Sequence, residues 1–252
     1  MAPAAAFRPF TALPAERQYE LEFELYALSR VADVLALEFQ PPYGDGPVLD
    51  GVRMEVAPAE RSAFFVRLGM TEVGAAGGFD PFLHEIAELV PAEDPDAPIE
   101  LLDVLWPGLT FGELLFVRAG VRVRAGARVA EPGWADGSPM YWAHRRRGRR
   151  PVDLSHGWGS HSQWRTSHRM DFRTADGDRW NVVRDSERLS EHRAGDGRLT
   201  AAEAGELLRH RCLLRRPAGC PDLVPDSQEA ADFWLFDSSL PEPARCARGC
   251  HG

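Results

Sequence analysis

The sequence contains no lysine, so all 29 basic side chains are arginines. This bias is typical of a GC-rich genome, and it also excludes several mechanisms. Without a lysine amine the chain cannot form a Schiff base, which rules out pyridoxal-phosphate and lysine-aldolase chemistry. Phosphate-loop NTPases and protein kinases need a lysine at the nucleotide phosphates. Pyridoxal phosphate and a P-loop nucleotide are therefore excluded as cofactors.

Long apolar runs are also lacking. No stretch reaches the roughly 18 apolar residues of a membrane span, and the first residues lack the apolar core of a signal peptide. The formal charge of −9 and the pI of about 5.4 disfavour non-specific contact with nucleic acid or anionic membranes. We therefore expect a cytoplasmic protein without a membrane partner, whose cysteines are reduced.

The composition is that of a globular protein, with 252 residues of which 44% are hydrophobic and 27% charged. Helical and strand patterns are segregated along the chain, which predicts an α+β fold with antiparallel sheet elements and segregated helices. Residues 1–15 are rich in alanine and proline and are expected to form a flexible arm. Residues 16–240 are expected to form one α+β domain, with 91–98 as its best internal boundary, and 241–252 a cysteine-containing tail.

In the first half of the chain, apolar spacing predicts two helices and leaves the type of one further element undecided. Residues 16–39 have helical spacing, although alternation at the start leaves a strand as the alternative there. A second helix is expected from Pro58 to Leu68, ended by Gly69. Residues 82–90 fit a strand and a helix equally well.

The second half is expected to be richer in strands. Residues 114–117 and 121–123 indicate two strands of a meander, separated by a turn at residues 118–120. A hairpin is predicted with strands near 161–173 and 179–183. Thr200 and Glu203 have the spacing of a capping box before a helix at 201–211, and another short helix is expected from Asp226.

Residues 141–172 hold four of the eight histidines, three of the seven tryptophans and seven arginines. On a strand, alternate residues share a face, so Gln163, Arg165 and Arg169 would lie on one side, with Met170 and Phe172 on the other. The first set is rich in hydrogen-bond donors and suits a carboxylate or phosphate. The alternative is a solvated face whose arginines pair with neighbouring acids.

Trp158 lies between two glycines, which leave its indole uncovered and let the chain turn tightly. An indole in that setting serves either as a plug over a sheet edge or as a platform on which a ligand stacks. The plug is the favoured role, because aromatic side chains mostly lie in cores and interfaces, and the stacking platform is the alternative.

Two metal sites are considered. His156 and His161 form a candidate pair, with Asp153 or Asp171 as the third ligand that a metal site needs. The many arginines nearby disfavour a bound cation. The four cysteines form a second candidate site, for zinc: Cys212, Cys220, Cys246 and Cys250. The alternative for Cys212 is the role of a small buried apolar side chain.

The sequence favours a non-enzymatic protein that binds an anionic small molecule or an acidic partner surface. The expected contacts are Trp158, Gln163, Arg165 and Arg169. The alternative is an enzyme, metal-assisted or acid–base, with its site in residues 153–171 and with His156, His161 and Asp171 as its catalytic groups. A nucleic-acid contact through the arginines of residues 145–150 is disfavoured by the negative charge of the chain.

Overall fold

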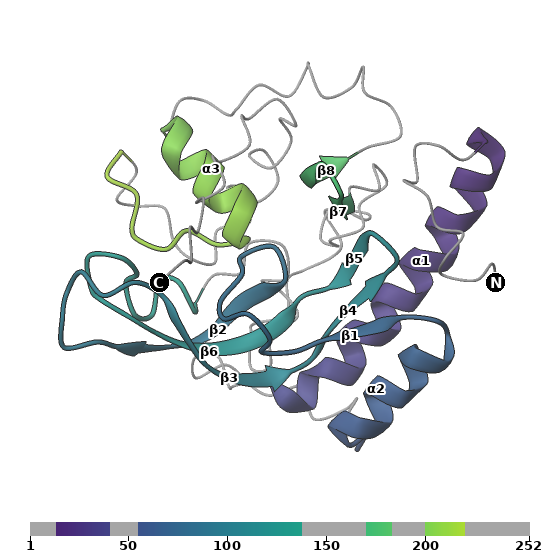
Figure 1. The fold of residues 1–252 in the computed structure, drawn as a ribbon, viewed down its shortest axis with the longest axis horizontal. Coiled ribbons are helices and arrows are strands. Elements are labelled where there is room, and N and C mark those ends of the chain that lie inside the picture. Colours follow the sequence, from purple (N-terminus) through teal and green to yellow (C-terminus); the bar gives the residue numbers. More distant parts are fainter. Residues whose placement is uncertain (1–13, 41–54, 138–169, 183–199, 220–252) are drawn as a thin grey trace, which may run out of the picture.

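A computed structural model describes residues 14–40, 55–137, 170–182 and 200–219. In these segments the fold is α+β, as the sequence predicts, with helices and two sheets (Figure 1). One sheet has the strand order β1-β4-β5-β7-β8 and the other β2-β6-β3. The elements in chain order are α1 (Ala15–Ala36), the 3-10 turn η3 (Leu37–Phe39), α2 (Pro58–Arg67), β1 (Thr71–Val73), β2 (His84–Pro91), β3 (Glu100–Trp106), β4 (Gly108–Phe111), β5 (Leu114–Val117), β6 (Ala119–Ala125), β7 (Met170–Thr174), β8 (Gly177–Val182) and α3 (Ala201–His210).

Both sheets are built on one long antiparallel ribbon of two paired arms, which runs from one sheet into the other. Its first arm is β3 followed by β4, and its second arm is β5 followed by β6. The pairing of Leu109 with Val117 in one sheet continues as Trp106 with Gly120 in the other. The arms are joined by a two-residue loop, whose first residue, Gly112, has a φ of +61°. Glycine at this position suits a tight hairpin turn.

The predicted meander turn at residues 118–120 is therefore wrong. The chain runs on from β5 into β6, interrupted only at Arg118, and β6 pairs with β2 and β3 rather than with β5. Gly120 serves close packing instead of a turn. A Cβ atom placed there would lie 2.1 Å from the ring of Trp106, which covers this glycine from the neighbouring strand. Glycine within a strand is a common sign of such a close approach.

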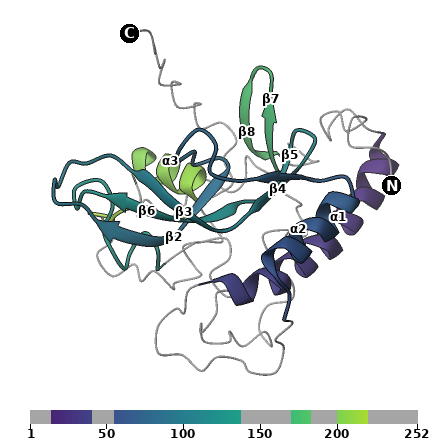
Figure 2. The same cartoon turned by 60° about the horizontal axis from the view of Figure 1, so that its bottom comes forward.

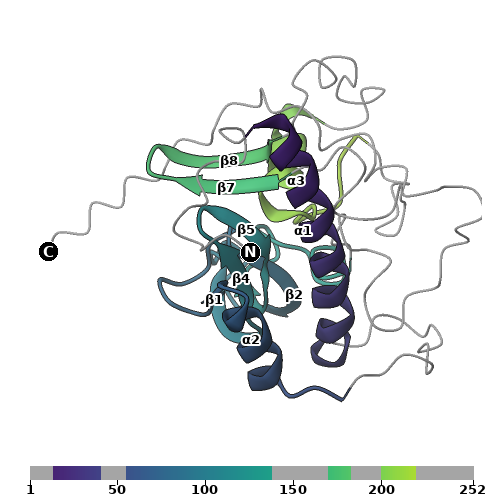
Figure 3. The same cartoon turned by 90° about the vertical axis from the view of Figure 1, so that its right-hand side faces the viewer.

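Other strands extend the ribbon at its two ends. In the five-stranded sheet β1 pairs antiparallel with β4, and the hairpin of β7 and β8 pairs antiparallel through β7 with β5. In the three-stranded sheet β2 pairs with β6 in parallel. Figure 3 shows β7 and β8 side by side as a hairpin. Residues 82–90, which fitted two patterns equally, thus contain a strand.

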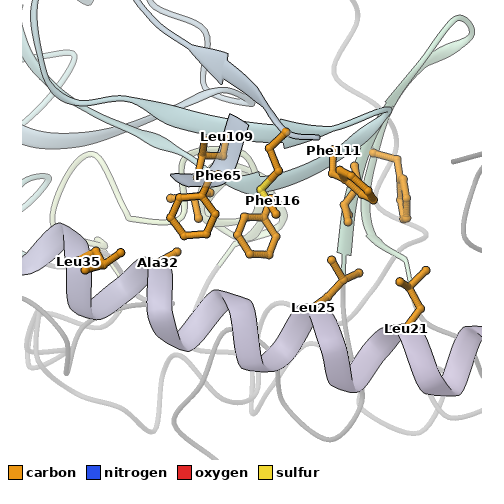
Figure 4. Packing of buried hydrophobic residues seen from close by; sticks show 12 residues of the cluster. Leu21, Leu25, Ala32, Leu35, Phe65, Leu109, Phe111 and Phe116 are labelled. Atoms are coloured by element: carbon orange, nitrogen blue, oxygen red, sulfur yellow. The ribbon is translucent and has the colours of Figure 1, made fainter. Parts of the chain in front are cut away.

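The helix α1 packs along one side of the ribbon. Its buried side chains, Leu21, Leu25, Ala32 and Leu35, are spaced as on one face of a helix and point toward β4, β5 and Phe65 of α2 (Figure 4). At its C-terminal end, Ala36 contacts the cluster of Trp106 and Ala87 on the second sheet. The helix predicted for residues 16–39 is confirmed, and the same helix supports both sheets.

The opposite side of the ribbon carries α3 and the hairpin β7–β8 (Figure 2). After α3 the chain places Cys212 and Leu214 in an apolar cluster with Val121 and Val123 of β6. The predicted capping box is confirmed, because the Thr200 hydroxyl accepts from the Glu203 backbone and the Glu203 carboxylate accepts from the Thr200 backbone.

Other predictions about the helices and strands are tested only in part. The helix from Pro58 is confirmed and is followed by Gly69 with a φ of +91°. The hairpin is confirmed for residues 170–182, whereas 161–169, 183 and the helix from Asp226 lie outside the described residues. Residues 91–98 are hydrogen-bonded to the end of β6 and the loop after it, and the domain boundaries stay predictions. No helix in the described segments has the length and hydropathy of a membrane span.

Replacing Gly120 by alanine should lower the free energy of unfolding by about 1–3 kcal/mol, because the new methyl group overlaps the ring of Trp106. Gly74→Ala is the matched control, since nothing lies within 4 Å of its Cβ position, and we expect a change within about 0.5 kcal/mol. Urea unfolding of the two variants measures both values. Equal stabilities would contradict the packing of Trp106 on Gly120.

Candidate functional site

Arg118 lies at the point where the ribbon passes from one sheet to the other. Its Nη1 donates to the backbone carbonyl of Pro81, before β2, and to that of Arg209, in α3, at 2.9 Å. Its Nη2 donates to Oδ2 of Asp171, in β7, at 3.2 Å. One side chain therefore connects the ribbon with three separate segments of the chain.

Arg211 approaches the same carboxylate from the end of α3. Its Nη2 also donates to Oδ2 of Asp171. The backbone of Arg211 is left-handed, with a φ of 59°, and its N–H donates to the carbonyl of Leu207 to close the helix. Glycine usually occupies such a position, because a side chain is disfavoured there.

Trp180 of β8 completes the cluster. The guanidinium carbons of Arg118 and Arg211 lie 5.3 and 6.0 Å from the centre of its ring, which is cation–π distance. The ring of Phe82 meets it edge-on at 5.2 Å. The indole Nε1 is buried and has no acceptor among the described residues. We call Arg118, Asp171, Trp180 and Arg211 the arginine junction.

The arginine junction is buried, and burial disfavours the charged forms of its side chains. The side chains of Arg118, Arg211 and Asp171 are 5, 6 and 8% exposed. Burial, together with repulsion from Arg211, lowers the pKa of Arg118 to about 10, against the opposing effects of Asp171 and Glu85. The two carboxylates thus do not restore the stability that the Arg118 cation has in water.

A second ion cluster lies beside the junction. Arg173 of β7 donates to Asp178 of β8 at 2.7 Å and to Asp80 at 2.6 Å, and its guanidinium lies 4.5 Å from the ring centre of Phe82. Burial alone would raise the pKa of Asp80, but the hydrogen bonds from Arg173 and the Phe82 backbone keep it below its usual value. Here one arginine is matched by two acids, so the cluster needs no further anion.

Two histidines near the junction are held neutral. His84 accepts from the backbone N–H of Asp80 through Nδ1 and donates to the Gly74 carbonyl through Nε2. Burial lowers its pKa. His210 stacks on Phe79 at 5.9 Å, and its Nδ1 is buried with no partner among the described residues. Burial, with repulsion from Arg118 and Arg209, lowers the pKa of His210 to about 3.

Most of the site residues predicted from the sequence lie outside the described segments. These are Asp153, His156, Trp158, His161, Gln163, Arg165, Arg169, Cys220, Cys246 and Cys250. The described part of the chain contains no group of three or more His, Cys, Asp or Glu side chains arranged to hold a metal. The predicted metal sites thus stay predictions.

Asp171 and Cys212 are the two predicted site residues that the structure describes. Asp171 is held by two arginines, and its neighbour Phe172 is buried in the core beside α1, so β7 is covered on both faces at this point. Cys212 is 2% exposed and packs with aliphatic side chains, which confirms its role as a buried apolar side chain.

Arg118, Arg211 and Trp180 were not identified from the sequence. Arg118 was assigned to a turn, although one arginine between two apolar stretches is itself a sign of a buried, partnered charge. Arg211 and Trp180 carry no comparable local signal.

No protein-family model matches the sequence, and no curated protein or solved structure matches it either. The arginine junction is therefore interpreted from its own geometry.

Asp171→Asn should lower the free energy of unfolding by about 3–5 kcal/mol, because it removes the negative charge to which two buried arginines donate. Asp176→Asn removes the same charge from the exposed turn of the hairpin and should cost less than about 0.5 kcal/mol. Chemical denaturation compares the two. If both variants lose the same small amount, Asp171 is not the countercharge of the junction.

Acid should destabilise the fold through His210. Because its pKa is lowered in the folded state, the unfolded chain takes up the proton first, so stability is complete above about pH 6.5 and falls toward pH 3. The largest loss of unfolding free energy expected from this one group is about 1.4 kcal/mol per pH unit, or about 2 kcal/mol between pH 7 and pH 5. His210→Phe should remove this loss, measured as the difference in unfolding free energy between variant and wild type at each pH. A difference that does not change with pH would refute it.

Proposed function

We propose that the protein binds an anionic small molecule or an acidic partner surface without catalysing a reaction. The proposed contacts are Trp158, Gln163, Arg165 and Arg169, which belong to the chain just before β7. A guanidinium binds a carboxylate or phosphate through paired hydrogen bonds, and an indole adds a stacking surface.

The observation that carries the proposal is the closeness of Arg169 to the arginine junction. Only one residue separates Arg169 from Asp171, so their Cα atoms are at most about 7 Å apart by chain geometry alone. At the junction two arginines already share one carboxylate oxygen. The guanidinium of Arg169 would add positive charge to this part of the chain, which an anionic ligand would balance.

The distribution of charge along the chain also supports the proposal. Residues 138–169 hold seven arginines and one aspartate, a formal charge of +6, whereas the whole chain carries −9. A basic segment in an acidic protein attracts anions locally, while the net charge repels nucleic acid as a whole.

The alternative of a metal-assisted or acid–base enzyme gains less support. It would use Asp171 as a catalytic group together with His156 and His161. The Asp171 carboxylate is 8% exposed, and one of its oxygens accepts from two guanidinium groups. A carboxylate in this position serves as a countercharge more readily than as a proton acceptor for a substrate.

Replacing Arg165 and Arg169 by alanine together should weaken the binding of an anion by at least about tenfold while leaving the thermal unfolding midpoint unchanged. The reason is the loss of two charge-assisted contacts, each worth about 1.5–3 kcal/mol. Isothermal titration calorimetry with inorganic phosphate, with citrate and with an acidic peptide measures the affinity and separates the two kinds of ligand.

The control is a double variant with the same change of charge, Arg67→Ala with Arg179→Ala, at two exposed arginines. It should bind all three probes as the wild type does. If the two double variants bind equally, the arginines before β7 are only solvated surface and the proposed function is wrong.

A further inference from the structure

We propose that α2 is the contact surface of a homodimer, in which the exposed faces of α2 from two copies of the chain pack antiparallel across a two-fold axis. The helix lies on the side of the described structure away from α3 and the hairpin β7–β8 (Figures 1 and 3). The proposal goes beyond the proposed function, because no residue of α2 belongs to the contacts proposed before β7.

The first argument is the apolar character of the exposed face of α2. Phe65 is buried in the core, and on the open side of the helix Phe64 and Val66 are 39 and 49% exposed. Ala59 and Ala63 are exposed on the same helix. Two of the four large apolar side chains exposed in the described segments thus lie within three residues of each other. One such side chain is ordinary, but several on one helix face indicate a protein contact.

The second argument is that the face is already ordered. The ring of Phe64 meets that of Phe65 edge-on, with 5.0 Å between the ring centres, and Phe65 is fixed in the core beneath it. A side chain held in place before contact loses less entropy on binding. Ala59 and Ala63 are one helical turn apart, and their small side chains leave room for a ring from a second helix.

The third argument identifies the partner as a second copy of the chain. Glu60 and Arg67 are about 10 Å apart on the same side of the helix, because seven residues make about two turns. Glu60 accepts from the N–H of Ala57 and Arg67 donates to the carbonyl of Ala63, and neither forms an ion pair with another described residue. An antiparallel pair with its axis midway between them places Glu60 of each copy opposite Arg67 of the other. A parallel pair would instead place like charges together.

The exposed face of α2 is therefore complementary to itself, as a two-fold interface requires. Its size limits the strength of the contact. The helix has ten residues. At about 15 Å in length, it offers less than the roughly 800 Å² per partner of a standard interface. We expect a weak dimer, with a Kd on the order of 100 µM.

The first experiment is sedimentation of the full-length protein between about 10 µM and about 1 mM, where the average mass should rise from that of a monomer toward that of a dimer. Phe64→Ser should weaken the dimer at least about tenfold, since the lost apolar contact counts once for each copy. Val90→Ser is the matched control, because Val90 is 36% exposed on β2 in the other sheet. It should leave the Kd within about twofold.

The second experiment exchanges the charges. Arg67→Glu alone and Glu60→Arg alone should each abolish self-association, because every pair across the axis then has like charges. An equimolar mixture of the two variants should dimerise again, since one copy now carries two arginines and the other two glutamates at these positions. Circular dichroism checks that each variant is folded, because Glu60 also caps α2.

The outcomes are distinct. A wild type that stays monomeric at the highest concentration overturns the inference and leaves the face to a different protein. A dimer that Phe64→Ser does not weaken uses another surface and also overturns it. A mixture no heavier than its two components refutes the antiparallel pairing. If Glu60→Arg does not fold, Phe64→Ser and Arg67→Glu decide. Loss of the dimer and loss of anion binding are separate results, because the two proposals share no contact residue.

Discussion

The described fold depends on one buried guanidinium, that of Arg118. Strand pairing joins the ribbon to β1, β2 and β7, whereas Arg118 also joins it to α3. Arg118 sits where the sheets part and donates to carbonyls before β2 and in α3 as well as to Asp171 in β7. Hydrogen bonds to a charged donor in a buried setting are stronger than neutral ones, so these three contacts define how the surrounding segments meet.

Burying the arginines of the junction has costs in free energy of folding, which the surrounding structure offsets. Two arginines leave water and share one carboxylate oxygen, and Arg211 adopts a left-handed backbone that costs about 1–2 kcal/mol. Packing on both sides of the ribbon offsets them. On one side α1 buries its leucines against β4 and β5, and on the other Cys212 and Leu214 cover β6. The polar centre thus lies between two apolar clusters that are able to stabilise it.

Sequence reasoning succeeded where one local rule decides the structure. The leucine spacing of α1, proline and glycine at the ends of α2, and Thr200 with Glu203 before α3 each follow from short-range geometry. It failed at residues 118–120, because glycine marks a turn and a close approach equally well, and only Trp106, fourteen residues earlier, decides between them. The arginine junction combines residues from the ribbon, the hairpin and α3, and such long-range pairing leaves no periodic signal.

The junction and the cluster of Arg173 place arginine in the fold in different ways. A buried ion pair is a poor way to gain stability, since apolar side chains of similar size often serve as well. Arg173 is partly exposed and donates to both Asp80 and Asp178. Arg118 and Arg211 are buried and both donate to Oδ2 of Asp171, and burial lowers the pKa of Arg118 despite Asp171 and Glu85. The hydrogen bonds of the junction therefore fix how the ribbon, β7 and α3 meet, at a cost in desolvation of the charged groups.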